Sequence, residues 1–188
     1  MFPGLTGVVV HDRYQNYDKF PGITHQLCAA HLLRDLEDAA RSYPGAIWPG
    51  QIAGALRALI HAANLVREQG LAAVPDEATA EHLKLFRHGA RVGLSQVRRI
   101  PGARVEQPPA RLLLECLRDR EDDVLRFLTD LHIPPTSDLV SHCTSWVRSG
   151  VSGFSRWSGG VADVIVARGT DISRWLQRAA QARVVAAP

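Results

Sequence analysis

The sequence predicts a mainly α-helical protein with a small β element. Apolar residues recur every three or four positions in four segments, which indicates helices over residues 24–43, 52–70, 77–99 and 110–132. One short valine-rich run, residues 7–11, is a convincing strand, and residues 161–167 form a second candidate. With 188 residues, of which 46% are hydrophobic, the chain can bury one core with a helical appendage.

The strand at residues 7–11 ends in a chemically distinctive pair, His11 and Asp12. Three successive valines favour an extended strand that is buried on both faces. A carboxylate just past such a strand lies at the carboxyl edge of a sheet, where α/β proteins place their chemistry. Asp12 is therefore the first candidate site residue. A loop with two tyrosines follows and closes at Pro21 and Gly22.

The next segment is predicted to be a helix that begins at the N-cap Thr24 and runs to about residue 43. One apolar stripe follows it at helical spacing, made of Cys28, Leu32, Leu36, Ala39 and Tyr43. Because Cys28 belongs to this stripe, we interpret it as a core residue rather than as a reactive or ligating one.

A metal site on the same segment is an alternative, because two histidines and a cysteine lie close together in the sequence: His25, Cys28 and His31. On a helix these three side chains spread over an arc of about 120°, and no fourth ligand has matching spacing. A solvated polar face is the simpler interpretation, and its members are His31, Arg34, Asp35 and Asp38.

Residues 52–70 and 77–99 are predicted to form a helical hairpin joined by a short connector, residues 71–76. Gly70 is a typical residue for ending the first helix. The distal part of the hairpin has a basic edge made of Arg87, Arg91, Arg98, Arg99 and Arg104. A DNA-contacting face and an ordinary solvated face both remain open, and we favour the solvated face.

The last helical segment, residues 110–132, follows a Pro/Gly loop, and Pro109 suits a first helical turn. Its middle reads RDREDD, residues 118–123. Clustered carboxylates could hold a metal ion. The alternating arginines favour a solvated face of ion pairs instead.

Charge and cysteine content bear on the partner and the location of the protein. The net charge is +3, and the basic residues are 20 arginines and 2 lysines, which suits phosphate contacts but is weak evidence for nucleic acid. Cys28, Cys116 and Cys143 are odd in number and contain no CxxC pair, which favours a reducing, cytoplasmic location. We expect neither a signal peptide nor a membrane-spanning segment.

The strand, the aspartate, the aromatic loop and the HQLCAAHLLRDL segment together resemble the catalytic domain of insertion-sequence-66-type transposases. The matching residues are Asp12, His25, Leu27, Cys28, His31 and Arg34. The resemblance implies an RNase-H-like α/β fold with a helical insertion and a three-carboxylate, DDE-type site that holds Mg²⁺. It also implies that Asp12 is the second of these carboxylates, and therefore a metal ligand, and that the partner is DNA at the ends of the mobile element.

The chain departs from the family pattern at its third carboxylate. In the segment IPPTSDLVSHCTSW, Ser141 stands where the family has its catalytic glutamate, and Asp138 is a conceivable substitute. The first aspartate has no match. We therefore expect an inactive transposase fragment that starts in mid-domain and binds no Mg²⁺ productively. Its expected parts are a core remnant (1–44), the insertion (45–107), a returning helix with the degenerate glutamate segment (108–142) and a degenerate tail (143–188).

Other functions remain open. The chain could be a non-catalytic helical module that contacts DNA or an intact transposase, and self-association is also open. A hydrolase that uses His11 and Asp12 would need further histidines in a defined order, which the sequence lacks. Gly-rich phosphate loops and the GxSxG and HExxH motifs are absent from the sequence. Finally, we expect the strand at residues 7–11 to lack sheet neighbours and the protein to be marginally stable.

Overall fold

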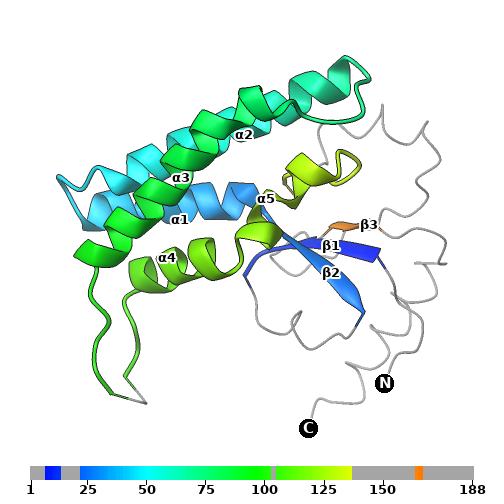
Figure 1. Ribbon diagram of the computed structural model, residues 1–188. Helices are drawn as coiled ribbons and strands as arrows, with labels where there is room; N and C mark the ends of the chain where they lie inside the picture. The colour runs from blue at the N-terminus through cyan, green and yellow to red at the C-terminus, as the bar shows by residue number, and fades with distance from the viewer. Residues whose placement is uncertain (1–6, 14–21, 103–104, 137–163, 167–188) are drawn as a thin grey trace, which may run out of the picture. The chain divides into compact units, whose positions relative to one another are not determined.

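The computed structural model describes residues 7–13, 22–102, 105–136 and 164–166 (Figure 1). The elements are, in chain order, β1 (Gly7–His11), β2 (Ile23–Leu27), α1 (Ala29–Ser42), α2 (Trp48–Glu68), α3 (Asp76–Gln96), α4 (Pro109–Asp119), α5 (Glu121–Thr129) and β3 (Val164–Val166). The chain divides into two compact units, residues 1–25 with 137–188 and residues 26–136. The predicted fold class, mainly helical with a small β element, agrees with this content.

The strands form one small sheet in the order β2-β1-β3. β1 pairs with β3 in antiparallel fashion, with Val9 opposite Ile165, and with β2 in parallel (Figure 1). The predicted strand at residues 7–11 is confirmed, and β3 lies inside the second candidate range. The expectation that this strand lacks neighbours is wrong, because β2 and β3 flank it on both sides.

The predicted helix over residues 24–43 begins later than expected. Residues 23–27 are strand β2, and α1 starts only at Ala29. Thr24 is therefore not a helix N-cap; that position belongs to Cys28, whose backbone is extended. Pairing with β1 decides the conformation of this segment, since local propensity is a weak preference that tertiary contacts override.

The second unit is helical and is built around the α2–α3 hairpin, whose two helices lie side by side (Figure 1). The sequence predicts this hairpin, and it also predicts the stop at Gly70, which has a positive φ of 68°. Two glycines of α3 let it approach its neighbours closely. A Cβ at Gly89 would lie 2.7 Å from Ile52 Cγ1, and one at Gly93 would lie 2.6 Å from Leu114 Cδ2.

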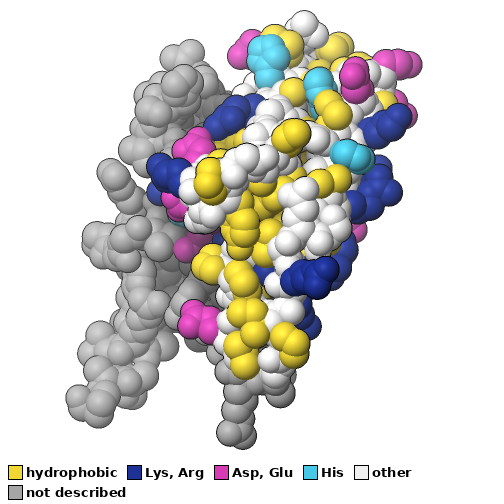
Figure 2. Space-filling model, turned by 90° about the vertical axis from the view of Figure 1, so that its left-hand side faces the viewer, with side chains coloured by type: hydrophobic (Ala, Val, Ile, Leu, Met, Phe, Trp, Pro, Cys, Tyr) yellow, Lys and Arg dark blue, Asp and Glu magenta, His cyan; other side chains and the backbone are white. Residues whose placement is uncertain are grey.

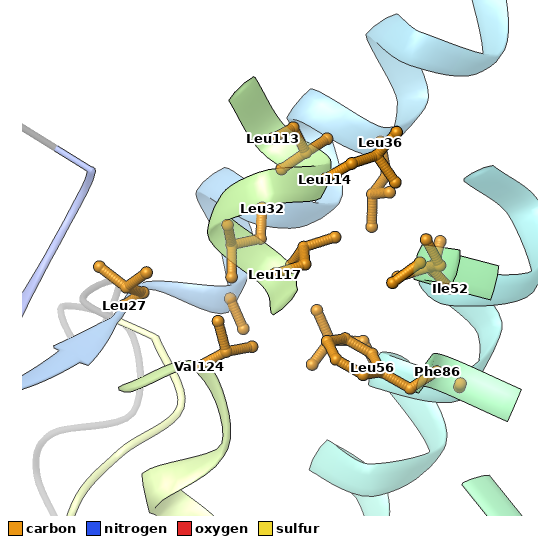
Figure 3. Close-up of a cluster of buried hydrophobic side chains, with 14 of the residues drawn as sticks. Leu27, Leu32, Leu36, Ile52, Leu56, Phe86, Leu113, Leu114, Leu117 and Val124 are labelled. Carbon is orange, nitrogen blue, oxygen red and sulfur yellow. The ribbon is translucent and has the colours of Figure 1, made fainter. Parts of the chain in front are cut away.

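A single apolar core fills the space between the helices of this unit. It contains fully buried side chains from β2 and from every helix, and those that converge in Figure 3 are Leu27, Leu32, Leu36, Ile52, Leu56, Phe86, Leu113, Leu114, Leu117 and Val124. Removing this apolar surface from water is the main stabilising contribution. Across the described ranges, no helix is both long and apolar enough to cross a membrane.

The predicted helix over residues 110–132 is in fact two helices. The break is at Arg120, whose φ of −119° and ψ of 32° are not helical. Its guanidinium bonds Asp123 at 2.9 Å, and Asp123 also pairs with Arg126. The acidic residues that follow occupy the first turn of α5, where the helix dipole favours negative charge. The charge run at 118–123 is thus a set of ion pairs, as predicted.

Candidate functional site

Asp12 lies where the sequence predicts, directly after the last residue of β1. Its side chain is half-buried. Because β1 runs parallel to β2, this is the carboxyl end of a parallel strand pair (Figure 1). Such edges are the usual sites for ligands in α/β proteins. The backbone therefore presents the Asp12 carboxylate at a position suited to a site.

Two histidines meet beside this strand end, and sequence reasoning missed their association. His11 on β1 is fully buried, and its Nε2 lies 3.1 Å from Nδ1 of His25 on β2. The two rings are nearly perpendicular, with centroids 5.2 Å apart. This hydrogen bond joins the end of β1, directly before Asp12, to the neighbouring strand. The sequence does not reveal the pair, because its helical periodicity places His25 on a helix.

The described residues do not by themselves match a magnesium-pair site. Mg²⁺ takes oxygen ligands, and a two-metal site needs several carboxylates. No group of three or more His, Cys, Asp or Glu side chains that could hold a metal ion occurs within residues 7–13, 22–102, 105–136 and 164–166. The side chains that meet at the end of β1 are imidazoles, which are nitrogen ligands. Asp138 and Ser141 lie outside the described residues.

The alternative metal site that the sequence suggests for His25, Cys28 and His31 is not formed on one helix either. His25 is on β2, so the helical arc that the sequence predicts for His25, Cys28 and His31 does not exist. Cys28 is 1% exposed, which confirms its assignment to the core. Arg34 and Asp38 are exposed, as expected for a polar face, and Asp38 pairs with Arg41. His31 and Asp35 are half-buried.

The basic edge of the helical unit is only partly available for a ligand. Arg87 donates two hydrogen bonds to Glu121, at 2.9 and 2.7 Å, which raise the pKa of Arg87. Nε of Arg99 lies 3.8 Å from Oε1 of Glu115. Arg104 is outside the described residues. Arg91 and Arg98 are exposed and have no ion pair with another described residue. On the face drawn in Figure 2, Lys and Arg side chains flank a band of hydrophobic ones.

A groove beside this edge is a feature that the sequence did not reveal. It lies between α3 and the junction of α4 with α5, and it has a volume of about 330 Å³. Its lining combines apolar side chains with charged ones: Phe86, Arg87, Ala90, Arg91, Leu94, Leu117, Arg118 and Glu121. Spacing along α3 could have shown which α3 residues share a face, but not that α4 and α5 complete the groove.

Comparison with known proteins identifies one family. The family model described as "Transposase IS66 family" matches residues 1–140 of the chain, which is well over half its length. No curated protein and no solved structure matches the chain. The matched range contains β1, Asp12, β2 and all five helices, and it ends one residue before Ser141.

Proposed function

Because the chain belongs to the IS66 family of transposases, we propose that it serves DNA transposition and that Asp12 is its contribution to the carboxylates that hold the family's Mg²⁺. The observation that supports this role is the position of Asp12, half-buried directly after β1 at the carboxyl end of a parallel strand pair. When bound, the metal ions would activate an attacking oxygen and stabilise a leaving one.

We further propose that the 188-residue chain does not cut or join DNA by itself. By the resemblance to the family pattern, Ser141 stands at the position of the glutamate, and a neutral hydroxyl is a poor substitute for a carboxylate as a ligand for a hard divalent cation. The family match covers residues 1–140 and does not include Ser141. The chain keeps Asp12 but not the acidic partner that the resemblance requires.

The test is a strand-cleavage assay of the purified chain on DNA that carries the ends of its mobile element. We expect no nicking in Mg²⁺ or Mn²⁺, because loss of a ligand from a preorganised metal site costs orders of magnitude in rate. Asp12→Ala is the control variant. Metal-dependent nicking that disappears in Asp12→Ala would refute the inactive chain and would direct attention to Asp138 as a substitute ligand.

A second candidate function is binding without catalysis, through the helical unit. The observation that favours it is the pair of exposed arginines on one edge, Arg91 and Arg98, which lack ion-pair partners in the described parts of the chain. Neighbouring guanidiniums are neutralised by carboxylates, as in Arg87–Glu121 and Arg111–Glu115. Guanidiniums without such partners are available for phosphates. Binding to an intact transposase subunit and self-association remain predictions.

This candidate predicts a salt-dependent affinity for duplex DNA. Replacing Arg91 or Arg98 by alanine should weaken binding and reduce the slope of log affinity against log salt by about 1 for each phosphate that is no longer neutralised. Arg57→Ala is a matched control, because Arg57 is also exposed but pairs with Glu37 at 2.9 Å. Slopes that stay the same in all three variants, measured by fluorescence anisotropy, would rule out a role for this edge in binding DNA.

A further inference from the structure

The chain leaves α3 through a segment whose backbone is held at two places. The first is directly after the helix, which ends at Gln96 and has Val97 as its C-cap, with the Val97 side chain only 3% exposed. The carbonyl of Val97 accepts a hydrogen bond from Arg111 Nη1 at 3.0 Å, and the same nitrogen donates to Leu94 O at 3.0 Å. Because Arg111 belongs to α4, the peptide group that joins Val97 to Arg98 is fixed to that helix.

The second place is held by the side chain of Gln107. Its amide oxygen accepts from Ile100 N at 2.8 Å, and its amide nitrogen donates to Ile100 O at 2.9 Å and to Val105 O at 3.2 Å. The first two bonds join one side chain to both polar backbone groups of one residue, as a neighbouring strand would do. Two arginines, Arg98 and Arg99, lie between the two held peptide groups.

Of these two arginines, Arg98 is the one that belongs to the DNA-binding edge proposed above. Both side chains are exposed, but Nε of Arg99 lies 3.8 Å from Oε1 of Glu115. Arg98 has no ion pair within the described ranges, and it follows Arg91, the other arginine of the edge, by seven residues. Since its backbone is held on both sides, Arg98 keeps a fixed position relative to α3 and therefore to Arg91.

We propose that Gln107 is a positioning residue for DNA binding: by holding Ile100, it fixes the backbone of Arg98. The guanidiniums of Arg91 and Arg98 can then neutralise two phosphates without further ordering of the chain. The inference rests on the DNA-binding edge proposed above and adds to it a residue that acts through another. A flexible segment must be ordered before it can bind, at an entropic cost that an already ordered segment avoids. Loss of the Gln107 bonds should therefore weaken binding without changing the number of phosphates contacted.

The deciding variant is Gln107→Met, which keeps the length and the neutral charge of the side chain but removes all three hydrogen bonds. The affinity of the full chain for a fluorescein-labelled duplex is measured by fluorescence anisotropy over a range of salt concentrations. We expect Gln107→Met to weaken binding about fivefold with an unchanged slope of log affinity against log salt. Arg98→Ala, by contrast, should reduce that slope by about 1.

The matched control is Gln96→Met, which makes the same change two residues before Arg98. Gln96 is exposed at the end of α3, and its side chain makes no hydrogen bond with another described residue, so this variant should bind DNA as the wild type does. The bonds of Gln107 are exposed, and Gln107→Met should therefore shift the melting temperature by less than about 2 °C. A larger drop would identify Gln107 as a stabilising residue of the helical unit and overturn the positioning role.

A double-mutant cycle tests whether Gln107 acts through Arg98. If it does, Gln107→Met has no further effect on binding in a chain that already carries Arg98→Ala. A loss of about fivefold that persists in that chain overturns the assignment, because Gln107 would then act through another residue.

Hydrogen exchange at the Ile100 amide, followed by NMR without DNA, tests the hold on the backbone by itself. This amide should exchange at least about fivefold faster in Gln107→Met than in the wild type or in Gln96→Met. Equal exchange overturns the hold. Faster exchange with unchanged DNA binding overturns the positioning role but leaves the DNA-binding edge in place, since Arg98→Ala tests that edge separately. If the wild-type chain binds no duplex, the edge and the positioning role both fail.

Discussion

Replacing Gln26 by leucine is expected to lower the free energy of unfolding of the helical unit by about 3 kcal/mol. The Gln26 side chain is fully buried, and its amide nitrogen donates to Val124 O at 3.0 Å and to Leu27 O at 2.7 Å. Its amide oxygen accepts from Phe127 N at 3.0 Å. Leucine has a similar volume but removes all three hydrogen bonds, and each buried backbone group that is left without another partner costs about 1–3 kcal/mol. Urea unfolding followed by circular dichroism measures the change.

The matched control is Gln51→Leu. Gln51 also bonds a backbone carbonyl, Leu85 O at 2.8 Å, and it lies 3.0 Å from Nδ1 of His88. These bonds are exposed, so water can replace them, and the expected cost is below about 0.5 kcal/mol. Equal losses in the two variants would mean that Gln26 stabilises the unit through packing alone. An m-value that changes with the mutation would point to altered compactness instead.

Replacing Arg67 by alanine is also expected to cost about 3 kcal/mol. The Arg67 guanidinium, which comes from α2, donates to three carbonyls at and beyond the end of α5: Leu131 O at 2.8 Å, Ile133 O at 2.7 Å and Phe127 O at 3.3 Å. Burial lowers the pKa of Arg67, but a guanidinium stays charged at neutral pH. Charge-assisted bonds contribute about 1.5–3 kcal/mol each in buried settings, and partial solvent access reduces the sum.

Arg57→Ala, which removes an arginine from the same helix, tests this explanation. Arg57 pairs with Glu37 while both side chains remain 54% exposed, so its loss should cost less than about 1 kcal/mol. Arg67→Lys separates the effect of charge from that of geometry. Lysine keeps the positive charge, but its compact ammonium group lacks the planar fork of donors with which the guanidinium binds the three carbonyls. Recovery of full stability in Arg67→Lys would show that charge alone accounts for the effect. A loss close to that of Arg67→Ala would support the geometry of the guanidinium.

The sequence alone predicted the parts of this protein that depend on local periodicity. The α2–α3 hairpin follows from apolar residues at helical spacing. Its first helix stops near Gly70, whose positive φ is a conformation that glycine adopts without steric cost. Three valines predicted β1, and the residue that follows the strand, Asp12, is the candidate site residue. The resemblance rested on order and spacing, and the family match over residues 1–140 confirms it.

The tertiary structure decided the features that depend on contacts between distant residues. Residues 23–27 are a strand because they pair with β1, although their amino-acid sequence is also compatible with the start of a helix. The break at Arg120 sets α5 apart from α4, and Gln26, 98 residues from Val124 in sequence, bonds to α5. The histidine pair beside Asp12 and the groove beside Arg91 arise in the same way. No local pattern encodes them, because the stabilising partner of each group lies on another element.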